Sequence, residues 1–315
     1  MNFKNKIFCY IGFTVVIFIA ALSLWIIFSN NKPPHKNKTE LIRKNYKIYA
    51  PDLPETLYFA NEKVPLENYD TRRGLDYEIL KIMYWHSETI LYLKRANEIF
   101  PIVEKILKQY KIPDDFKYLL VAESGMVNTT SPAGAKGYWQ FMKNTAKEYG
   151  LEINDDVDER LNLEKSTIAA CKYIKDAYNQ FNSWTLAAAA YNIGKDALKK
   201  QLQKQKVDNF YDLLLNRETS RYIYRILAYK LIFSNPRNYG FVLDTADMYK
   251  PVKTITISVD TSITNLIDFA QKQGTNYRML KILNPWLISN KLTNKKHKTY
   301  KIKIITLQNR KTYHF

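Results

Sequence analysis

Apolar residues recur at spacings of three and four through most of residues 66–240, and this pattern limits that part of the chain to packed α-helices. Residues 77–110 show the pattern best, and residues 166–181, 184–193 and 219–233 repeat it. A strand would instead alternate apolar and polar side chains with a period of two. We therefore predict a mainly α-helical domain over residues 66–245.

The chain begins with an uncharged, apolar run over residues 7–28. A helix of this length would extend roughly 33 Å, which is enough to cross a hydrocarbon core about 30 Å thick. The small residues that could precede a signal-peptidase site, residues 20–23, lie inside the run and not after it. We therefore predict that residues 1–30 form an uncleaved transmembrane helix that anchors the protein.

Residues 31–65 are polar, contain Pro33-Pro34 and scattered lysines, and are expected to form a tether. More basic residues follow the apolar run than precede it, and the positive-inside rule would therefore place the long C-terminal part in the cytoplasm. That rule is weakest where a long domain is translocated. The chemistry of the domain is therefore the better guide to its compartment.

The formal net charge is +18, from 48 Lys and Arg against 30 Asp and Glu. Nucleic acid, acidic lipid and an acidic cell-wall polymer are all partners that such a charge would suit. The chain has neither a glycine-rich phosphate loop nor a nucleic-acid-binding motif. Two Cys and four scattered His are too few for a disulfide framework or for most metal clusters. We predict no cofactor, no metal and no nucleic-acid partner.

One short helix is expected to carry an acidic side chain on its apolar face. It follows Pro113, and Phe116, Leu120 and Glu123 recur on one side of it before Gly125 ends it. Burial would raise the pKa of Glu123, because ionisation then loses solvation, and would make this side chain a proton donor. The alternative is that Glu123 points to solvent at the helix end or pairs with a lysine.

Two later segments bring together residues suited to a sugar. Residues 131–142 read SPAGAKGYWQFM, a turn of small residues that ends in aromatic and amide side chains. Such groups match the apolar faces and hydroxyl rims of sugars. Residues 184–194 read WTLAAAAYNIG, in which four alanines permit close helix packing and Tyr191 lies near the end. Each segment alone is equally compatible with ordinary core packing.

In this order, Glu123-Ser124-Gly125, SPAGAKGYWQFM, AYNIG (190–194) and ETSRY (218–222) resemble the motifs of the lytic murein transglycosylases of the goose-lysozyme-like superfamily. The similarity extends from about Pro65 to Tyr239. It implies a lysozyme-like, goose-type helical catalytic domain that cleaves the β-1,4 bond between N-acetylmuramic acid and N-acetylglucosamine. The C6 hydroxyl of the muramoyl sugar would attack, and a 1,6-anhydro end would form without water.

The resemblance also implies residue roles. Glu123 matches the single catalytic residue, acting first as acid and then as base. Ser131 matches the residue that orients this acid, and the alternative is that it caps the start of its loop. The remaining matched positions imply contacts with the sugar or support of the cleft: Gln140, Met142, Tyr191, Asn192, Glu218 and Tyr222.

The spacing of apolar residues changes near residue 253, from a helical pattern to one that includes strands. Residues 254–258 and 300–305 alternate as strands do, and residues 262–273 and 277–283 read as short helices between them. This order resembles a LysM carbohydrate-binding module over residues 250–307, a small α+β domain, with Asp260-Thr261 and Leu283-Asn284-Pro285 at its turns. The module would either bind sugar or serve as a structural cap.

These observations predict a membrane-anchored enzyme whose catalytic domain faces the cell wall, on the periplasmic side, and acts on peptidoglycan glycan strands. A muramidase that uses water is the related alternative, distinguished only by its product. A wall-binding protein without catalysis is a second alternative, and Glu123, Ser131 and Tyr191 argue against it. The sequence identifies no protein partner.

Overall fold

The structure is a computed structural model that describes residues 48–306 and 310–311. The membrane anchor predicted over residues 1–30 lies outside these residues. Among the helices of the described part, none combines the length and the apolar character that a membrane span requires. Contacts between Cα atoms assign residues 51–306 and 310–311 to one compact unit.

The segment that leads into the helical domain is a hairpin and not a tether. Strands β1 (Tyr58–Phe59) and β2 (Glu62–Lys63) pair antiparallel, and Phe59 and Val64 are buried in the main core. The Glu62 carboxylate accepts a hydrogen bond of 2.8 Å from the backbone N–H of Thr185. The expectation of a tether up to residue 65 is therefore wrong at its C-terminal end, because residues 57–66 pack against the helices.

Two long helices follow, α3 (Tyr69–Tyr84) and α4 (His86–Gln109), where the sequence indicated one helical stretch over residues 77–110. The helix breaks at Trp85, whose φ of −90° and ψ of 58° are not helical, and whose side chain is 51% exposed. The apolar spacing continues across the break because both helices face the same core. The periodicity therefore predicted the helices but not the bend.

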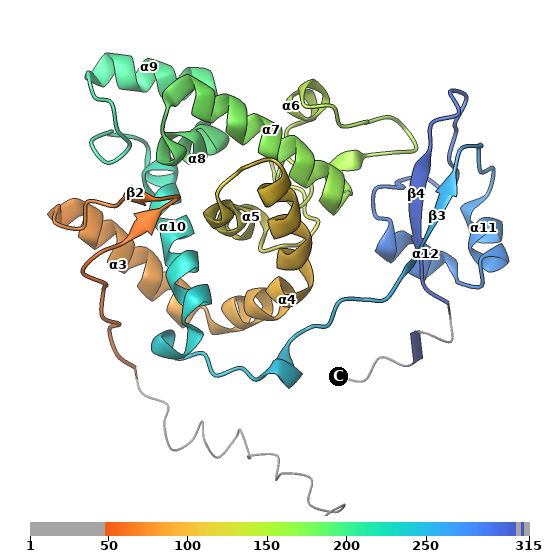
Figure 1. The fold of residues 1–315 in the computed structure, drawn as a ribbon, viewed down its shortest axis with the longest axis horizontal. Coiled ribbons are helices and arrows are strands. Elements are labelled where there is room, and N and C mark those ends of the chain that lie inside the picture. The colour runs from red at the N-terminus through yellow and green to blue at the C-terminus, as the bar shows by residue number, and fades with distance from the viewer. Residues whose placement is uncertain (1–47, 307–309, 312–315) are drawn as a thin grey trace, which may run out of the picture. The chain divides into compact units, whose positions relative to one another are not determined.

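The short helix that carries Glu123 forms as expected. A 3-10 turn, η1 (Asp114–Phe116), leads into α5 (Lys117–Ser124), and Gly125 ends the helix with φ = 57°. In Figure 1, α5 lies at the centre of the helices, and it contacts α4 and α10 (Arg217–Ser234). Phe116, Leu119 and Leu120 are fully buried on its inner face.

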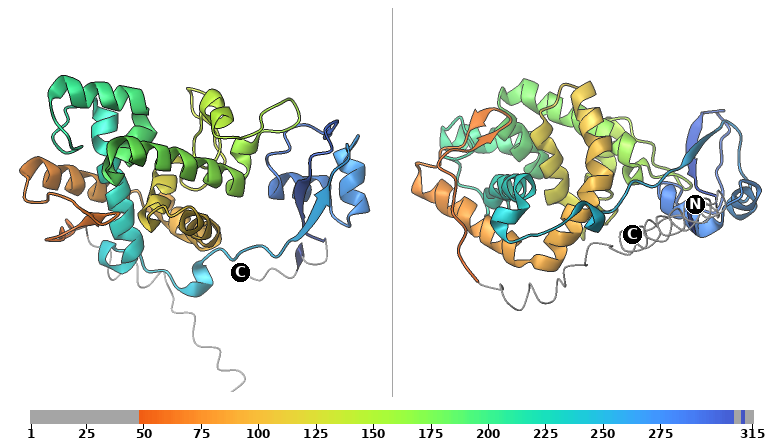
Figure 2. Two further views of the ribbon diagram at one scale, coloured as in Figure 1. Left: turned by 45° about the horizontal axis from the view of Figure 1, so that its top comes forward. Right: turned by 60° about the horizontal axis from the view of Figure 1, so that its bottom comes forward.

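The remaining helices enclose α5, as Figure 2 shows in two further views. Helix α8 contacts both α7 and α10, and residues 187–190, the four alanines, are fully buried, so that small side chains permit close approach. The other elements of this domain are α6 (Lys143–Glu148), η2 (Glu159–Leu161), α7 (Leu163–Phe181), α8 (Trp184–Ile193), α9 (Lys195–Gln205), η3 (Pro236–Tyr239) and η4 (Thr245–Asp247). The prediction of a mainly helical domain is confirmed.

The C-terminal region has its own apolar core and the predicted element order. Strands β3 (Ile255–Val259) and β4 (Tyr300–Ile304) pair antiparallel, and α11 (Leu266–Lys272) and α12 (Tyr277–Leu283) lie between them in sequence. Asn284 ends α12, and its side chain bonds both the N–H and the carbonyl of Lys303. This amide therefore ties the second helix to the second strand.

Candidate active site

A cleft of about 430 Å³ opens beside the C-terminal end of α5. It is bounded by α3, the start of α4, α5 and α10. Its lining residues are Glu78, Lys81, Ile82, Trp85, Tyr92, Val121, Ala122, Glu123, Ser124, Gly125, Thr129, Glu218, Arg225 and Tyr229. Exposed Trp85 and partly buried Tyr92 give the cleft aromatic surface, and its charged residues give it polar groups. Sugars need both kinds of contact.

Glu123 is partly buried at the floor of this cleft, on α5. The hydroxyl of Tyr222, from α10, donates a hydrogen bond to its Oε1 atom. Burial raises the pKa of Glu123 to about 7, against the lowering effects of the Tyr222 hydrogen bond and of the Arg225 charge. The side chain therefore holds a proton up to near-neutral pH, which is what a general acid requires.

The arginines near Glu123 are bound to other carboxylates. Arg225 donates a hydrogen bond of 2.9 Å to Glu218, and its Nε atom lies 3.7 Å from the carboxylate of Glu78. Glu78 is 1% exposed and also accepts a hydrogen bond from Arg221. The pKa of Glu123 stays raised because the effect of burial outweighs the lowering effect of the Arg225 charge, which the charge of Glu218 partly offsets.

The loop of residues 131–142 is held by its own hydrogen bonds. The Ser131 hydroxyl accepts a hydrogen bond of 3.0 Å from the N–H of Ala135, which is the capping role considered as the alternative. The Gln140 amide donates to the carbonyls of Gly137 (2.7 Å) and Thr129 (3.2 Å). Met142 is 47% exposed where the loop meets α6. None of these three residues, Ser131, Gln140 and Met142, lines the cleft.

Tyr191 connects α8 to the same loop. Its hydroxyl donates a hydrogen bond of 2.8 Å to the carbonyl of Trp139, and its ring packs edge-on against Phe141 and Tyr173. Burial raises the pKa of the Tyr191 hydroxyl well above its usual value, and the charge of Glu123 contributes. Tyr191 is therefore a neutral donor close to the acid, and Asn192 follows it, partly buried, on α8.

The structure brings only some of the expected residues together. Glu123 and Tyr222 are hydrogen-bonded, and Glu218 lines the same cleft. Ser131, Gln140, Met142, Tyr191 and Asn192 form the neighbouring loop and its support. Within residues 48–306 and 310–311, no group of three or more His, Cys, Asp or Glu side chains is arranged to hold a metal ion.

Sequence reasoning missed Glu78, Trp85 and Arg225, which line the cleft. Arg225 lies seven positions after Glu218, so both fall on one helix face, and this spacing was an available signal. Glu78 interrupts the apolar side of α3, where a buried carboxylate needs a cation. The partner of Glu78, Arg221, lies 143 positions away, and no local pattern reveals such a pairing.

Two family models match the chain. The Transglycosylase SLT domain matches residues 101–214, and the Soluble lytic transglycosylase C-terminal LysM-like domain matches residues 255–308. The first range contains Glu123 and the loop of residues 131–142, and the second contains β3, α11, α12 and β4. Both assignments agree with the element order of the two regions.

Curated relatives give the same result. Membrane-bound lytic murein transglycosylase D of Escherichia coli (strain K12) is 28% identical over 207 residues, which are 64% of this chain and 44% of the relative. Membrane-bound lytic murein transglycosylase F of Saccharophagus degradans is 31% identical over 123 residues, 35% of this chain and 23% of the relative. The chain thus matches less than half the length of these proteins.

Among solved structures, an inactive mutant of lytic transglycosylase Slt from Pseudomonas aeruginosa aligns with a TM-score of 0.35 and 20% identity, over 48% of this chain and 26% of that one. The family of the chain is assigned from sequence, by the two family models and the curated relatives. The chain contains a transglycosylase SLT domain followed by a LysM-like domain of the soluble lytic transglycosylase C-terminal type, and it is homologous to membrane-bound lytic murein transglycosylase D.

Proposed function

We propose that this protein is a peptidoglycan lytic transglycosylase that cleaves the β-1,4 bond between N-acetylmuramic acid and N-acetylglucosamine without water. The observation that carries the proposal is Glu123, an acid with a pKa of about 7 on the floor of a 430 Å³ cleft. The cleft has room for sugar rings, and the acid has the proton that a departing glycosidic oxygen requires. The helical domain would have the goose-type lysozyme fold.

Glu123 would act twice. It first protonates the bridging oxygen, so that the bond to the anomeric carbon breaks. It then accepts the proton of the C6 hydroxyl of the same muramoyl sugar, whose oxygen attacks the anomeric carbon and closes the 1,6-anhydro ring. The proton that Glu123 gives is thus replaced by the one it takes, and no water is consumed.

The charges around Glu123 favour this route over hydrolysis with two carboxylates. Retaining and inverting glycosidases place a second free carboxylate across the bond. The other acids of the cleft, Glu78 and Glu218, are both engaged by arginines. Both carboxylates are occupied by their arginine partners, so the nucleophile is expected to come from the substrate.

We assign supporting roles to the neighbouring residues. Tyr222 orients Glu123 through its hydrogen bond, and Glu218 fixes Arg225 at the cleft. Tyr191 and Gln140 hold the loop of residues 131–142 in place, and Asn192 would support Tyr191. Ser131 caps the turn of that loop, and the exposed Met142 would contact the glycan beyond the cleft. Peptidoglycan strands are the proposed substrate.

We also propose where the protein is located and how its chain is divided into domains. Residues 1–30 would anchor it in the membrane, with residues 66–245 as the catalytic domain on the periplasmic side and residues 250–307 as the LysM-like module. The relatives' names describe them as membrane-bound, which agrees with this arrangement.

Digestion of purified sacculi followed by mass spectrometry tests the proposal. Fragments with 1,6-anhydro ends, each one water lighter than the corresponding lysozyme products, are expected. Fragments with reducing ends would instead identify a muramidase. Binding to sacculi without release of any soluble fragment would identify a wall-binding protein and would overturn the proposal.

A further inference from the structure

The segment of residues 152–160 belongs to the catalytic domain but packs into the core of the LysM-like domain. Val157 is fully buried, and its neighbours there are apolar residues of the C-terminal domain. Its backbone pairs with Leu287 as an isolated β-bridge. Asp158 donates from its N–H to the carbonyl of Trp286, and Ile288 donates to the carbonyl of Asp156, each at 2.9 Å. The segment therefore adds a short strand to the LysM-like domain.

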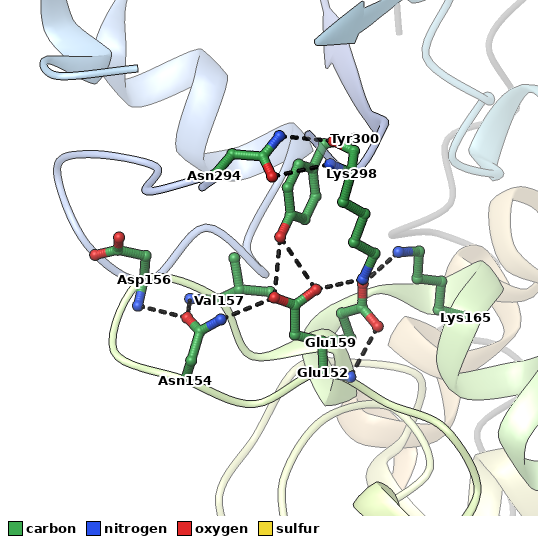
Figure 3. Close-up of polar contacts among 9 residues, drawn as sticks. All are labelled: Glu152, Asn154, Asp156, Val157, Glu159, Lys165, Asn294, Lys298 and Tyr300. Carbon is green, nitrogen blue, oxygen red and sulfur yellow. Dashed lines mark hydrogen bonds and ion pairs between the residues drawn. The ribbon is translucent and has the colours of Figure 1, made fainter. Parts of the chain in front are cut away.

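Charged and polar side chains reinforce this docking, as Figure 3 shows. Lys298 pairs with both Glu152 and Glu159, and the hydroxyl of Tyr300 donates to the Glu152 carboxylate at 2.9 Å. Burial opposes ionisation of Glu152, but Lys298 and Tyr300 hold its pKa below the usual value. The contact therefore combines a buried apolar residue, backbone pairing and charge.

The other side of the same segment holds the loop of residues 131–142. The Asp158 carboxylate pairs with Arg160 in a fork, at 2.9 Å to Nε and 2.7 Å to Nη2, and both side chains are buried. Arg160 Nη1 then donates to the carbonyls of Phe141 (3.2 Å) and Gly134 (3.3 Å). One residue, Asp158, thus bonds the LysM-like domain through its backbone and Arg160 through its side chain.

The loop of residues 131–142 and the segment before it also pack against the backbone of residues 160–161. A Cβ atom placed on Gly137, whose φ is +84°, would lie 1.9 Å from the carbonyl oxygen of Arg160. The Asn128 amide also donates a hydrogen bond of 3.1 Å to the carbonyl of Leu161. The loop thus rests directly on the backbone of residues 160–161, and movement of these residues would displace it.

We propose that the LysM-like domain holds the loop of residues 131–142 in place beside the cleft, because it fixes Arg160 through Asp158, and Arg160 positions the loop. The loop is joined to two residues that line the cleft, since Ser124 donates to the carbonyl of Tyr138 and Gln140 donates to the carbonyl of Thr129. Arg160 is then a positioning residue for the glycan. That last step rests on the proposed function, but the coupling between domain and loop does not. A groove that is already ordered binds glycan without the cost of ordering a loop at each encounter.

Hydrogen exchange of a variant with the full chain tests the coupling. Val157→Asp places a carboxylate in the apolar core of the LysM-like domain and should open the contact. Val242→Asp is the matched control, because Val242 is 66% exposed. The amides of Lys136 and Phe141 donate to each other's carbonyls, and that of Gly137 donates to the carbonyl of Thr129. We expect exchange at these three amides to rise by about tenfold or more in the first variant only.

The amides of Asp158 and Ile288 report whether the contact has opened. Faster exchange there with an unchanged loop would overturn the proposal, and so would a contact that remains closed, because Val157 would then not be needed for docking. If Val157→Asp does not fold, Val157→Ala is used instead, because it removes only two methyl groups. The same amides are then compared, and smaller increases in their exchange rates are expected.

Arg160→Lys tests the positioning role in catalysis. Lysine keeps the charge but loses the fork that reaches Asp158 and the loop together. We expect the concentration of sacculi at half-maximal rate to rise by about tenfold, with kcat and its pH dependence unchanged because Glu123 is untouched. A fall in kcat without this rise would overturn the positioning role of Arg160.

The failure of the proposed function and the failure of this inference can be distinguished. An inactive wild-type enzyme would refute the proposed function, while the exchange experiment would still decide whether the domain and the loop are coupled.

Discussion

The cleft beside α5 and the segment of residues 152–160 both bury acidic side chains, but they give those side chains different partners. Asp158 and Glu159 are each 2% exposed, and each is paired with a cation, Arg160 for the first and Lys165 for the second. Glu123 instead receives a hydrogen bond from the neutral Tyr222. A paired cation compensates the charge of a buried carboxylate, whereas burial of Glu123 without such a pair raises its pKa.

This difference separates an acid that holds the structure together from an acid that can do chemistry. Breaking a buried ion pair leaves an uncompensated charge, and the main consequence is lost stability. Removing an acid whose pKa burial has raised relieves the protein of a charge that it accommodates poorly, and the main consequence is lost activity. The two regions should therefore respond to mutation in opposite ways.

The largest effect is expected for activity in Glu123→Gln. Glutamine keeps the shape of the side chain and can accept the Tyr222 hydrogen bond, but it has no proton to give. Release of soluble fragments from sacculi should fall by about 10³-fold or more. Glu104→Gln is the control, because Glu104 lies on α4, pairs with Lys117 and is not among the residues that line the cleft, so activity should persist. Full activity in Glu123→Gln would remove Glu123 from the mechanism.

The next effect is a loss of stability in Arg160→Met, which leaves Asp158 buried without its cation. We expect the free energy of unfolding to fall by about 3–5 kcal/mol. The exposed pair of Lys63 and Glu67 provides the control, with side chains 55% and 61% exposed. Lys63→Met should cost less than about 1 kcal/mol. Equal losses in denaturant unfolding of the two variants would contradict the distinction between buried and exposed pairs.

The sequence predicted those helices whose positions depend on interactions between residues close in the chain. Helix α8 has the predicted bounds, and α5 ends at Gly125 as expected, because periodicity, capping and a glycine at positive φ act within a few residues. The hairpin of residues 58–63 was missed, since its burial depends on contacts such as Glu62 with α8, more than 120 positions away. A short strand pair has little pattern of its own.

The site divides in the same way. Glu123 could be predicted from its place on the apolar face of a short helix, and its raised pKa followed from burial alone. The network of Glu78, Arg221 and Arg225 could not, because charged residues on α3 and α10 resemble solvated positions until the fold joins them. Likewise, nothing in the sequence of residues 152–160 indicates that Val157 is enclosed by residues of the C-terminal region, and only the tertiary structure reveals it.

The pH dependence of stability is the third test. The folded-state pKa of Glu123 is about 7, above the usual 4.5, so ionisation opposes folding. The cost is absent below pH 4.5, grows as pH rises, and is complete above about pH 7. Glu123→Gln should therefore be more stable than the wild type at pH 8 by roughly 2–3 kcal/mol, with little difference at pH 4. A variant that is less stable at pH 8 would contradict the unpaired burial of Glu123.

The smallest effect is expected for Tyr222→Phe, which removes the hydrogen bond that the Tyr222 hydroxyl donates to Glu123 and keeps the ring. That hydrogen bond lowers the pKa of Glu123, so its loss should raise the pKa further and move the alkaline limit of activity to higher pH. The rate should also fall by about tenfold, because the acid loses the donor that orients it. Tyr239→Phe, a buried tyrosine outside the residues that line the cleft, should shift neither quantity. An unchanged pH profile in Tyr222→Phe would show that burial alone sets the acidity of Glu123.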